Sequence, residues 1–103
     1  MKKNNFFYSL IVISVFFFIP TKADQKFDLG KKLFLNNCGV CHALLDAQTS
    51  GYIGPNLNLV RFDKIRIIGA VKNGIGVMPA FEGILSSKDI EAVAHYVAIA
   101  SNN

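Results

Sequence analysis

The chain has 103 residues, of which 51% are hydrophobic, with two cysteines, no tryptophan and a formal net charge of +4. Three of its 11 basic residues fall within the first 23 positions, so from residue 24 onward eight basic residues stand against seven acidic ones, a net charge of +1. That balance excludes a nucleic-acid partner, which requires a basic surface to neutralise phosphates.

The first 23 residues have the layout of a secretory signal peptide. Lys2 and Lys3 precede an apolar run at 6–19, and small residues lead to an expected cut after Ala23. The alternative is an uncleaved membrane anchor, but a helix of about 14 residues rises only about 21 Å, short of the roughly 30 Å hydrocarbon core. We therefore expect an exported, periplasmic protein with a leader at 1–23 and one domain at 24–103. A domain that small usually needs a disulfide, a metal or a cofactor to complete its core.

The first helical pattern after the leader covers 26–37, with Asp24 as its expected N-cap. Its apolar residues are Phe27, Leu29, Leu33 and Phe34. Gly30 interrupts the pattern at a cost in helix propensity, which indicates close packing against another backbone.

Both cysteines and one of the two histidines stand in the stretch CGVCH at 38–42. Cysteines at this spacing occur in half-sites for zinc, in redox dithiols, in plain disulfides and in covalent haem anchors. Zinc is disfavoured because a structural site needs four ligands, usually from two paired clusters, and the only further candidate is the distant His95. A thioredoxin-like dithiol is disfavoured because it follows a strand in an α/β fold, and no strand pattern is present. A plain disulfide between Cys38 and Cys41 remains the simplest alternative in an exported protein.

Cys-x-x-Cys-His is also the attachment signature for c-type haem. Two cysteines three apart on a turn of helix face the same side, so each sulfur can add to one haem vinyl group. His42 directly after Cys41 is then carried under the ring, where an imidazole nitrogen can bind iron. The motif therefore favours one covalently attached haem c.

Two further helices are expected, at 63–74 and 86–97. The first starts at Asp63 as N-cap and ends at Gly74. The second starts with a capping box of Ser86 and Asp89. Their apolar positions are Ile65, Ile68 and Val71 in the first helix, and Ile90, Val93, Ala94 and Val97 in the second. The stretches 51–55 and 74–79 are glycine- and proline-rich loops, and without an alternating strand pattern the fold class is all-α.

The ordered motifs resemble those of the small class I bacterial cytochromes c, over most of 24–100. Gly30, Phe34 and Cys38 at four-residue intervals resemble that family's N-terminal helix. Segment 54–57 resembles its Gly-Pro-x-Leu segment, 77–81 its methionine loop, and 85–97 its C-terminal helix. The resemblance implies that the N- and C-terminal helices cross, with Gly30, Phe34 and Tyr96 packed at the crossing, and that the helices wrap around one haem.

The expected iron ligands are His42 and Met78. Met78 is the only methionine after the leader, and it lies in a loop rather than on an apolar helical stripe. The resemblance further implies that the Pro55 carbonyl accepts a hydrogen bond from the other ring nitrogen of His42, which fixes the ring. His95 is the rival sixth ligand, but helical spacing places it nearly opposite the apolar face of the last helix, toward solvent.

The resemblance also implies a lining for the haem pocket, in which we expect Leu57, Ile68 and Phe81. The tryptophan that binds a haem propionate in longer relatives is missing, and Arg61 and Asn56 are candidates to replace it.

Two filled axial positions leave no place for oxygen, peroxide or a small-molecule substrate. We therefore expect a monomeric one-electron carrier without catalytic residues, exchanging electrons with periplasmic or membrane-bound redox proteins. The alternatives are a haem subunit permanently docked on a dehydrogenase or oxidase, and a gas or peroxide sensor with a labile Met78.

A partner is expected to approach the haem edge on the cysteine side through a mainly apolar, transient contact of low area. Lys72 precedes this rim. The residues that frame the edge are Val40, Ala43, Ile75, Gly76, Val77, Pro79 and Ala80.

Overall fold

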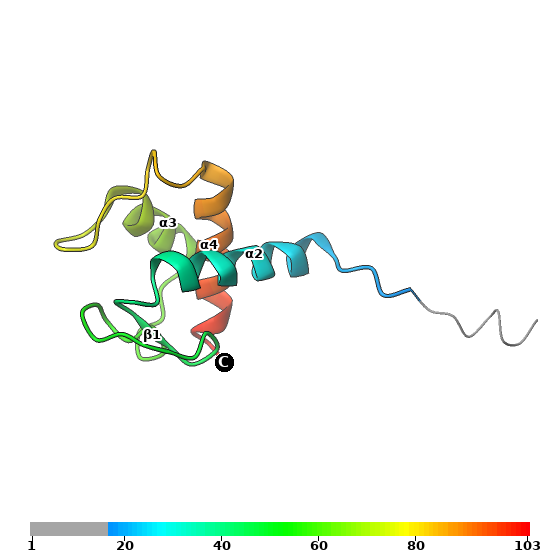
Figure 1. Cartoon of the computed structure of the whole chain (residues 1–103), viewed down its shortest axis with the longest axis horizontal. Helices are drawn as coiled ribbons and strands as arrows, with labels where there is room; N and C mark the ends of the chain where they lie inside the picture. Colours follow the sequence, from blue (N-terminus) through cyan, green and yellow to red (C-terminus); the bar gives the residue numbers. More distant parts are fainter. Residues whose placement is uncertain (1–16) are drawn as a thin grey trace, which may run out of the picture.

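The computed structural model describes residues 17–103, and helices dominate that part of the chain (Figure 1). They are α2 (Lys22–Asn37), α3 (Lys64–Asn73) and α4 (Ser87–Ala100). The predicted all-α class is confirmed. The structure also contains a small antiparallel hairpin that the sequence did not predict. It is formed by β1 (Ala43–Leu44) and β2 (Thr49–Ser50), in which Ala43 pairs with Ser50. Strands of two residues are too short to leave an alternating pattern in the sequence.

Most of the expected leader lies outside the described residues. Within 17–103, no helix is both long enough and apolar enough to cross a membrane.

Helix α2 passes across α4, and this crossing is built around a glycine (Figure 1). A Cβ atom at Gly30 would collide with the backbone carbonyl of Ala92 and lie 2.6 Å from Cβ of Tyr96. Phe34 and Tyr96 are fully buried beside it, with ring centroids 5.7 Å apart. The close backbone packing predicted at Gly30, and the crossing of the two helices, are confirmed.

The start of α2 differs from the prediction. Its N-cap is Thr21, whose Oγ1 accepts a hydrogen bond of 3.2 Å from the backbone N–H of Asp24. Asp24 is the third residue of the helix, and its carboxylate accepts in return from the Thr21 backbone N–H at 3.3 Å. The predicted cap at Asp24 is therefore wrong by three residues, because the reciprocal capping box reaches back to Thr21. The expected cut after Ala23 falls inside the first turn.

Helix α3 has the predicted ends but buries a different face. The Asp63 carboxylate accepts from the backbone N–H of Arg66 at 2.9 Å, and Gly74 follows the helix with φ of 73°. The buried residues are Ile67 and Val71, four apart, whereas Ile65 is 80% exposed. The predicted apolar face through Ile65 was wrong, because the packing of α3 against α4 selects the 67/71 row.

Helix α4 begins after the predicted Ser86 cap, whose Oγ accepts from the Asp89 N–H at 3.1 Å. The helix runs three residues beyond its predicted end at Val97. Its Glu91 carboxylate accepts from Lys26 of α2 at 3.0 Å and from Lys64 of α3 at 2.7 Å. One acid therefore ties all three helices together.

Candidate cofactor site

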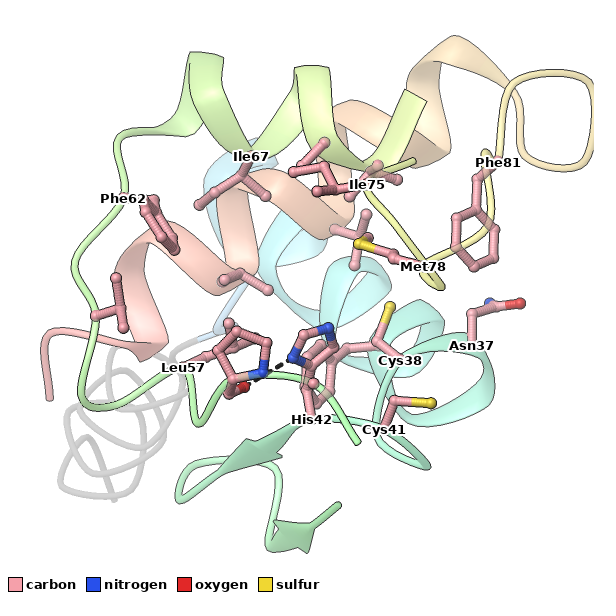
Figure 2. A pocket seen from close by; sticks show the side chains of 18 of the residues that line it. Asn37, Cys38, Cys41, His42, Leu57, Phe62, Ile67, Ile75, Met78 and Phe81 are labelled. Carbon is pink, nitrogen blue, oxygen red and sulfur yellow. Dashed lines mark hydrogen bonds between the residues drawn. The ribbon is translucent and has the colours of Figure 1, made fainter. Parts of the chain in front are cut away.

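One cavity of about 380 Å³ lies between the three helices and the connecting loops (Figure 2). Its lining is predominantly apolar. The five residues singled out from the sequence as binding residues all line it: Cys38, Cys41, His42, Pro55 and Met78. The fold thus brings together side chains that are up to 40 positions apart in the chain.

The two cysteines lie at one end of this cavity (Figure 2). Cys38 is the C-cap of α2, and its carbonyl accepts from the backbone N–H groups of Cys41 at 3.1 Å and His42 at 3.0 Å. This tight turn at the end of α2 holds the two thiols and the imidazole close to one another. Both cysteines are free in this structure, and no disulfide joins them.

Burial, with a smaller contribution from the neighbouring Cys41, raises the pKa of the Cys38 thiol to about 11. A thiol that stays protonated near neutral pH is a poor nucleophile in spontaneous disulfide exchange. Among the described residues, no group of three or more His, Cys, Asp or Glu side chains is arranged to hold a metal.

The His42 ring is fixed by two backbone neighbours. Its Nδ1 lies 2.8 Å from the Pro55 carbonyl oxygen, the hydrogen bond expected from the sequence. Because the carbonyl only accepts, Nδ1 carries the proton and Nε2 keeps a free lone pair. Gly54 packs against the ring, where a Cβ atom would lie 2.7 Å from Nδ1. Figure 2 shows the second ring nitrogen turned into the cavity.

Met78 lies across the cavity from His42, in the loop after α3 (Figure 2). Met78 and Ile75 exchange backbone hydrogen bonds of 2.9 and 3.2 Å, which close a tight turn. Gly74 and Gly76 have φ of 73° and 56° in this turn, and residues other than glycine rarely adopt such positive φ values. The loop is thereby shaped so that the thioether faces inward.

The structure confirms part of the predicted pocket lining and corrects the rest. Leu57 and Phe81 line the cavity as expected, but Ile68 does not, and Ile67 takes its place because α3 is rotated toward the 67/71 row. His95 is half-buried and lies outside the lining.

The two propionate candidates do not lie at the cavity either. Arg61 is exposed and Asn56 points its Oδ1 at the backbone of Asn58, 2.9 Å away. Three polar lining residues, Asn37, Arg66 and Ser101, were not singled out from the sequence. Arg66 stands four positions before Ala70, another lining residue, and the two therefore share one face of α3.

Exposed apolar residues surround the cysteine end of the cavity. Val40, Ile75 and Val77 are 77%, 68% and 87% exposed, and the last two also line the cavity. Lys72, the basic residue next to this rim, lies 3.7 Å from the Glu82 carboxylate. These exposed residues are therefore apolar, and Lys72, three positions before Ile75, pairs with an acid.

Comparisons with known proteins agree on one family. The family model described as cytochrome c oxidase, cbb3-type, subunit III matches residues 25–97. Cytochrome c6 of Gracilaria tenuistipitata var. liui is 39% identical over 84 residues, covering 74% of each chain. The cbb3-type oxidase subunit FixP of Bradyrhizobium sp. (strain ORS 278) is 38% identical over 85 residues, which are 77% of this chain and 29% of FixP.

Among solved structures, the c-type cytochrome SorU of Sinorhizobium meliloti has a TM-score of 0.73 and 44% identity, over 77% of this chain and 94% of SorU.

Proposed function

The chain belongs to the cytochrome c family, whose cofactor is covalently bound haem c with its iron, and from that premise we propose that it is a one-electron carrier of the periplasm. When bound, the haem iron supplies the chemistry by accepting and releasing one electron. The observation that carries the proposal is the pair His42 and Met78 facing each other across an apolar cavity, with two free thiols at its end.

The residues around the cavity fit this cofactor. Cys38 and Cys41 would hold its vinyl edge through thioethers, because both thiols lie at one end of the lining. His42 would bind the iron through Nε2, since Nδ1 is committed to Pro55. Met78 would supply the second ligand, a thioether sulfur, from across the cavity. A histidine–methionine pair raises the reduction potential of haem iron.

A carrier is favoured over an enzyme because His42 and Met78 would both be used to hold the iron, which would leave no position for a substrate. A nitrogen and a sulfur ligand would require little rearrangement between the two oxidation states. The apolar lining of the cavity also favours exclusion of water from the ring. No small-molecule substrate is therefore part of the proposal, and the partners are other redox proteins.

Docking is proposed at the exposed apolar rim of Val40, Ile75 and Val77. An apolar surface of this kind releases water when a partner approaches, and it supports a brief, small contact. The similarity to FixP, of which the chain spans 29%, favours one alternative, a haem domain that stays docked on an oxidase.

Purification of the protein exported from intact cells tests both the leader at 1–23 and the cofactor ligation. We expect one haem per chain that stays with the protein in acid–acetone, a low-spin spectrum and little carbon monoxide binding after reduction. Haem released into the organic phase would exclude thioether attachment. Rapid carbon monoxide binding would favour a sensor. Elution far above the size of the 24–103 domain in size-exclusion chromatography would favour the docked subunit.

A further inference from the structure

The main chain of His42 is held by a side chain that lies outside the cavity. The hydroxyl of Thr49, a half-buried residue of β2, donates a hydrogen bond of 2.8 Å to the His42 carbonyl oxygen. Because a carbonyl only accepts, the single hydroxyl proton is committed to this contact. Thr49 Oγ1 in turn accepts from the backbone N–H of Leu44 at 3.1 Å. Thr49 therefore bridges the proposed iron ligand and the strand that follows it.

The methyl group of Thr49 is placed against the attachment motif as well. A Cβ atom at Gly39, between the two cysteines, would lie 2.6 Å from Thr49 Cγ2, so the methyl group occupies the space that this glycine leaves. Two residues later, a Cβ atom at Gly51 would lie 2.7 Å from the backbone nitrogen of His42. The segment 49–51 thus lies directly against the backbone of the motif, and none of its residues lines the cavity.

The hairpin that carries Thr49 is itself anchored to the helices. Leu44 of β1 is fully buried in the core. In the turn between the two strands, the Asp46 carboxylate accepts a hydrogen bond of 2.7 Å from the Tyr96 hydroxyl and lies 3.4 Å from the Lys31 ammonium. These contacts fix the hairpin to α4 and to α2. Thr49 is therefore a fixed point of the fold and can hold another group in place.

Pro55 and Thr49 restrain different parts of His42. The Pro55 carbonyl, 2.8 Å from Nδ1, sets the tautomer and the rotation of the imidazole. The Thr49 hydroxyl acts on the carbonyl of the same residue, so it limits rotation of the main chain from which the ring extends. The place of Nε2 depends on both, because a change in either the main chain or the ring moves it.

We propose that Thr49 is a positioning residue for the proposed iron ligand: its hydroxyl holds the main chain of His42 so that Nε2 stays directed into the cavity (Figure 2). Thr49 does not line the cavity, so it acts through His42 alone. The inference rests on the proposed function, because it requires His42 to bind the iron. Loss of the hydroxyl then changes the geometry of histidine ligation in the folded protein, in addition to any loss of stability.

The test compares Thr49→Val with Thr49→Ser in the oxidised, haem-loaded protein. Valine keeps the shape of threonine and removes both hydrogen bonds, whereas serine keeps the hydroxyl and removes only the methyl group. Proton NMR of the His42 ring reports its placement, since low-spin ferric iron displaces nearby resonances by an amount that depends on their position. We expect Thr49→Val to shift these resonances and to speed solvent exchange of the Nδ1 proton about two- to tenfold, the range for loss of one net hydrogen bond. Thr49→Ser should stay near the wild-type values.

Two control variants separate positioning from general effects. Ser50→Ala removes an exposed hydroxyl from the neighbouring residue of the same strand. Glu91→Gln weakens the ion pairs with Lys26 and Lys64, at a residue that does not line the cavity. Neither control should shift the His42 resonances. The Thr49→Val shift appearing also in Glu91→Gln would trace it to stability, and its appearance in Thr49→Ser would trace it to the methyl group; either result would overturn the inference.

A second measurement uses the wild-type protein and does not depend on the folding of a variant. The Thr49 hydroxyl proton should exchange slowly enough with water to give its own resonance, with a nuclear Overhauser effect to the Leu44 amide proton. A freely exchanging hydroxyl, or wild-type His42 resonances in Thr49→Val, would overturn the inference while leaving the carrier function intact. A protein without covalent haem, or without histidine ligation in its spectrum, would instead overturn the proposed function and this inference with it.

Discussion

The imidazole of His42 donates its Nδ1 proton to the carbonyl oxygen of Pro55, 2.8 Å away and 13 positions later in the chain. The same segment holds the ring from below, because Gly54 leaves no space between its backbone and the imidazole. The Gly-Pro pair thus sets both the tautomer and the tilt of the proposed iron ligand.

Gly54→Ala should displace this ring. A methyl group there would lie 2.7 Å from Nδ1, so the ring or the loop has to move. We expect a loss of about 1–3 kcal/mol in the free energy of unfolding and altered iron–histidine bands in the visible spectrum. The control is Gly69→Ala in α3, where a Cβ atom meets nothing within 4 Å. Identical spectra and stabilities for the two variants would contradict the role of Gly54.

Gly30→Ala should weaken the crossing of α2 and α4 without touching the cavity. The new Cβ would meet the Ala92 carbonyl, which is backbone and cannot rotate away. We expect destabilisation by about 1–3 kcal/mol in urea unfolding of the haem-loaded protein, with the spectrum of the folded state unchanged. Wild-type stability in this variant would show that the crossing is looser than the structure indicates.

Met78→Ala should open the sixth coordination position. The oxidised variant is expected to bind cyanide faster, to lose the weak red-edge band of sulfur ligation and to shift to a lower potential, because the methionine ligand raises it. Stopped-flow cyanide binding and redox titration measure these effects. His95→Ala is the control and should leave the wild-type spectrum unaltered, since His95 does not line the cavity. A Met78→Ala protein with wild-type cyanide binding would move the ligand elsewhere.

Val77→Glu should slow electron transfer to the native partner more than Lys72→Ala does. Val77 is 87% exposed at the rim, whereas Lys72 lies beside Glu82. Because docking through apolar residues depends little on charge, the wild-type electron-transfer rate should change only a few-fold between about 10 and 150 mM salt. Across that range the Debye length falls from roughly 30 to 8 Å. A hundred-fold suppression by salt, or a dominant effect of Lys72, would mean that charge steers docking.

Glu91→Gln should destabilise the protein near neutral pH and much less in acid. The hydrogen bonds from Lys64 and then Lys26 lower the pKa of Glu91 below its usual 4.5. A lowered folded-state pKa contributes stability above the unfolded pKa, and that contribution is lost as the pH falls through the folded value. The expected loss at pH 7 is up to about 1 kcal/mol, because the pairs are partly exposed. Thermal unfolding from about pH 7 down to 3 measures it, and a difference from wild type that persists undiminished in acid would exclude the ion pairs as its cause.

Features that depend only on neighbouring residues could be predicted from the sequence. The helix caps at Asp63 and Ser86, the glycine after α3 and the turn at 38–42 are local, because each is a contact between residues at most four positions apart. The motif also indicated the cofactor, since covalent attachment requires the cysteines and the histidine at fixed spacing.

Tertiary structure decided which faces the helices bury. The packing of α3 against α4 turned Ile67 inward in place of Ile68, and Arg66, although exposed, also lines the cavity. Helical periodicity ranks apolar positions along one element, but the rotation of a short helix is fixed by the partner it packs against, and that partner lies far away in the chain.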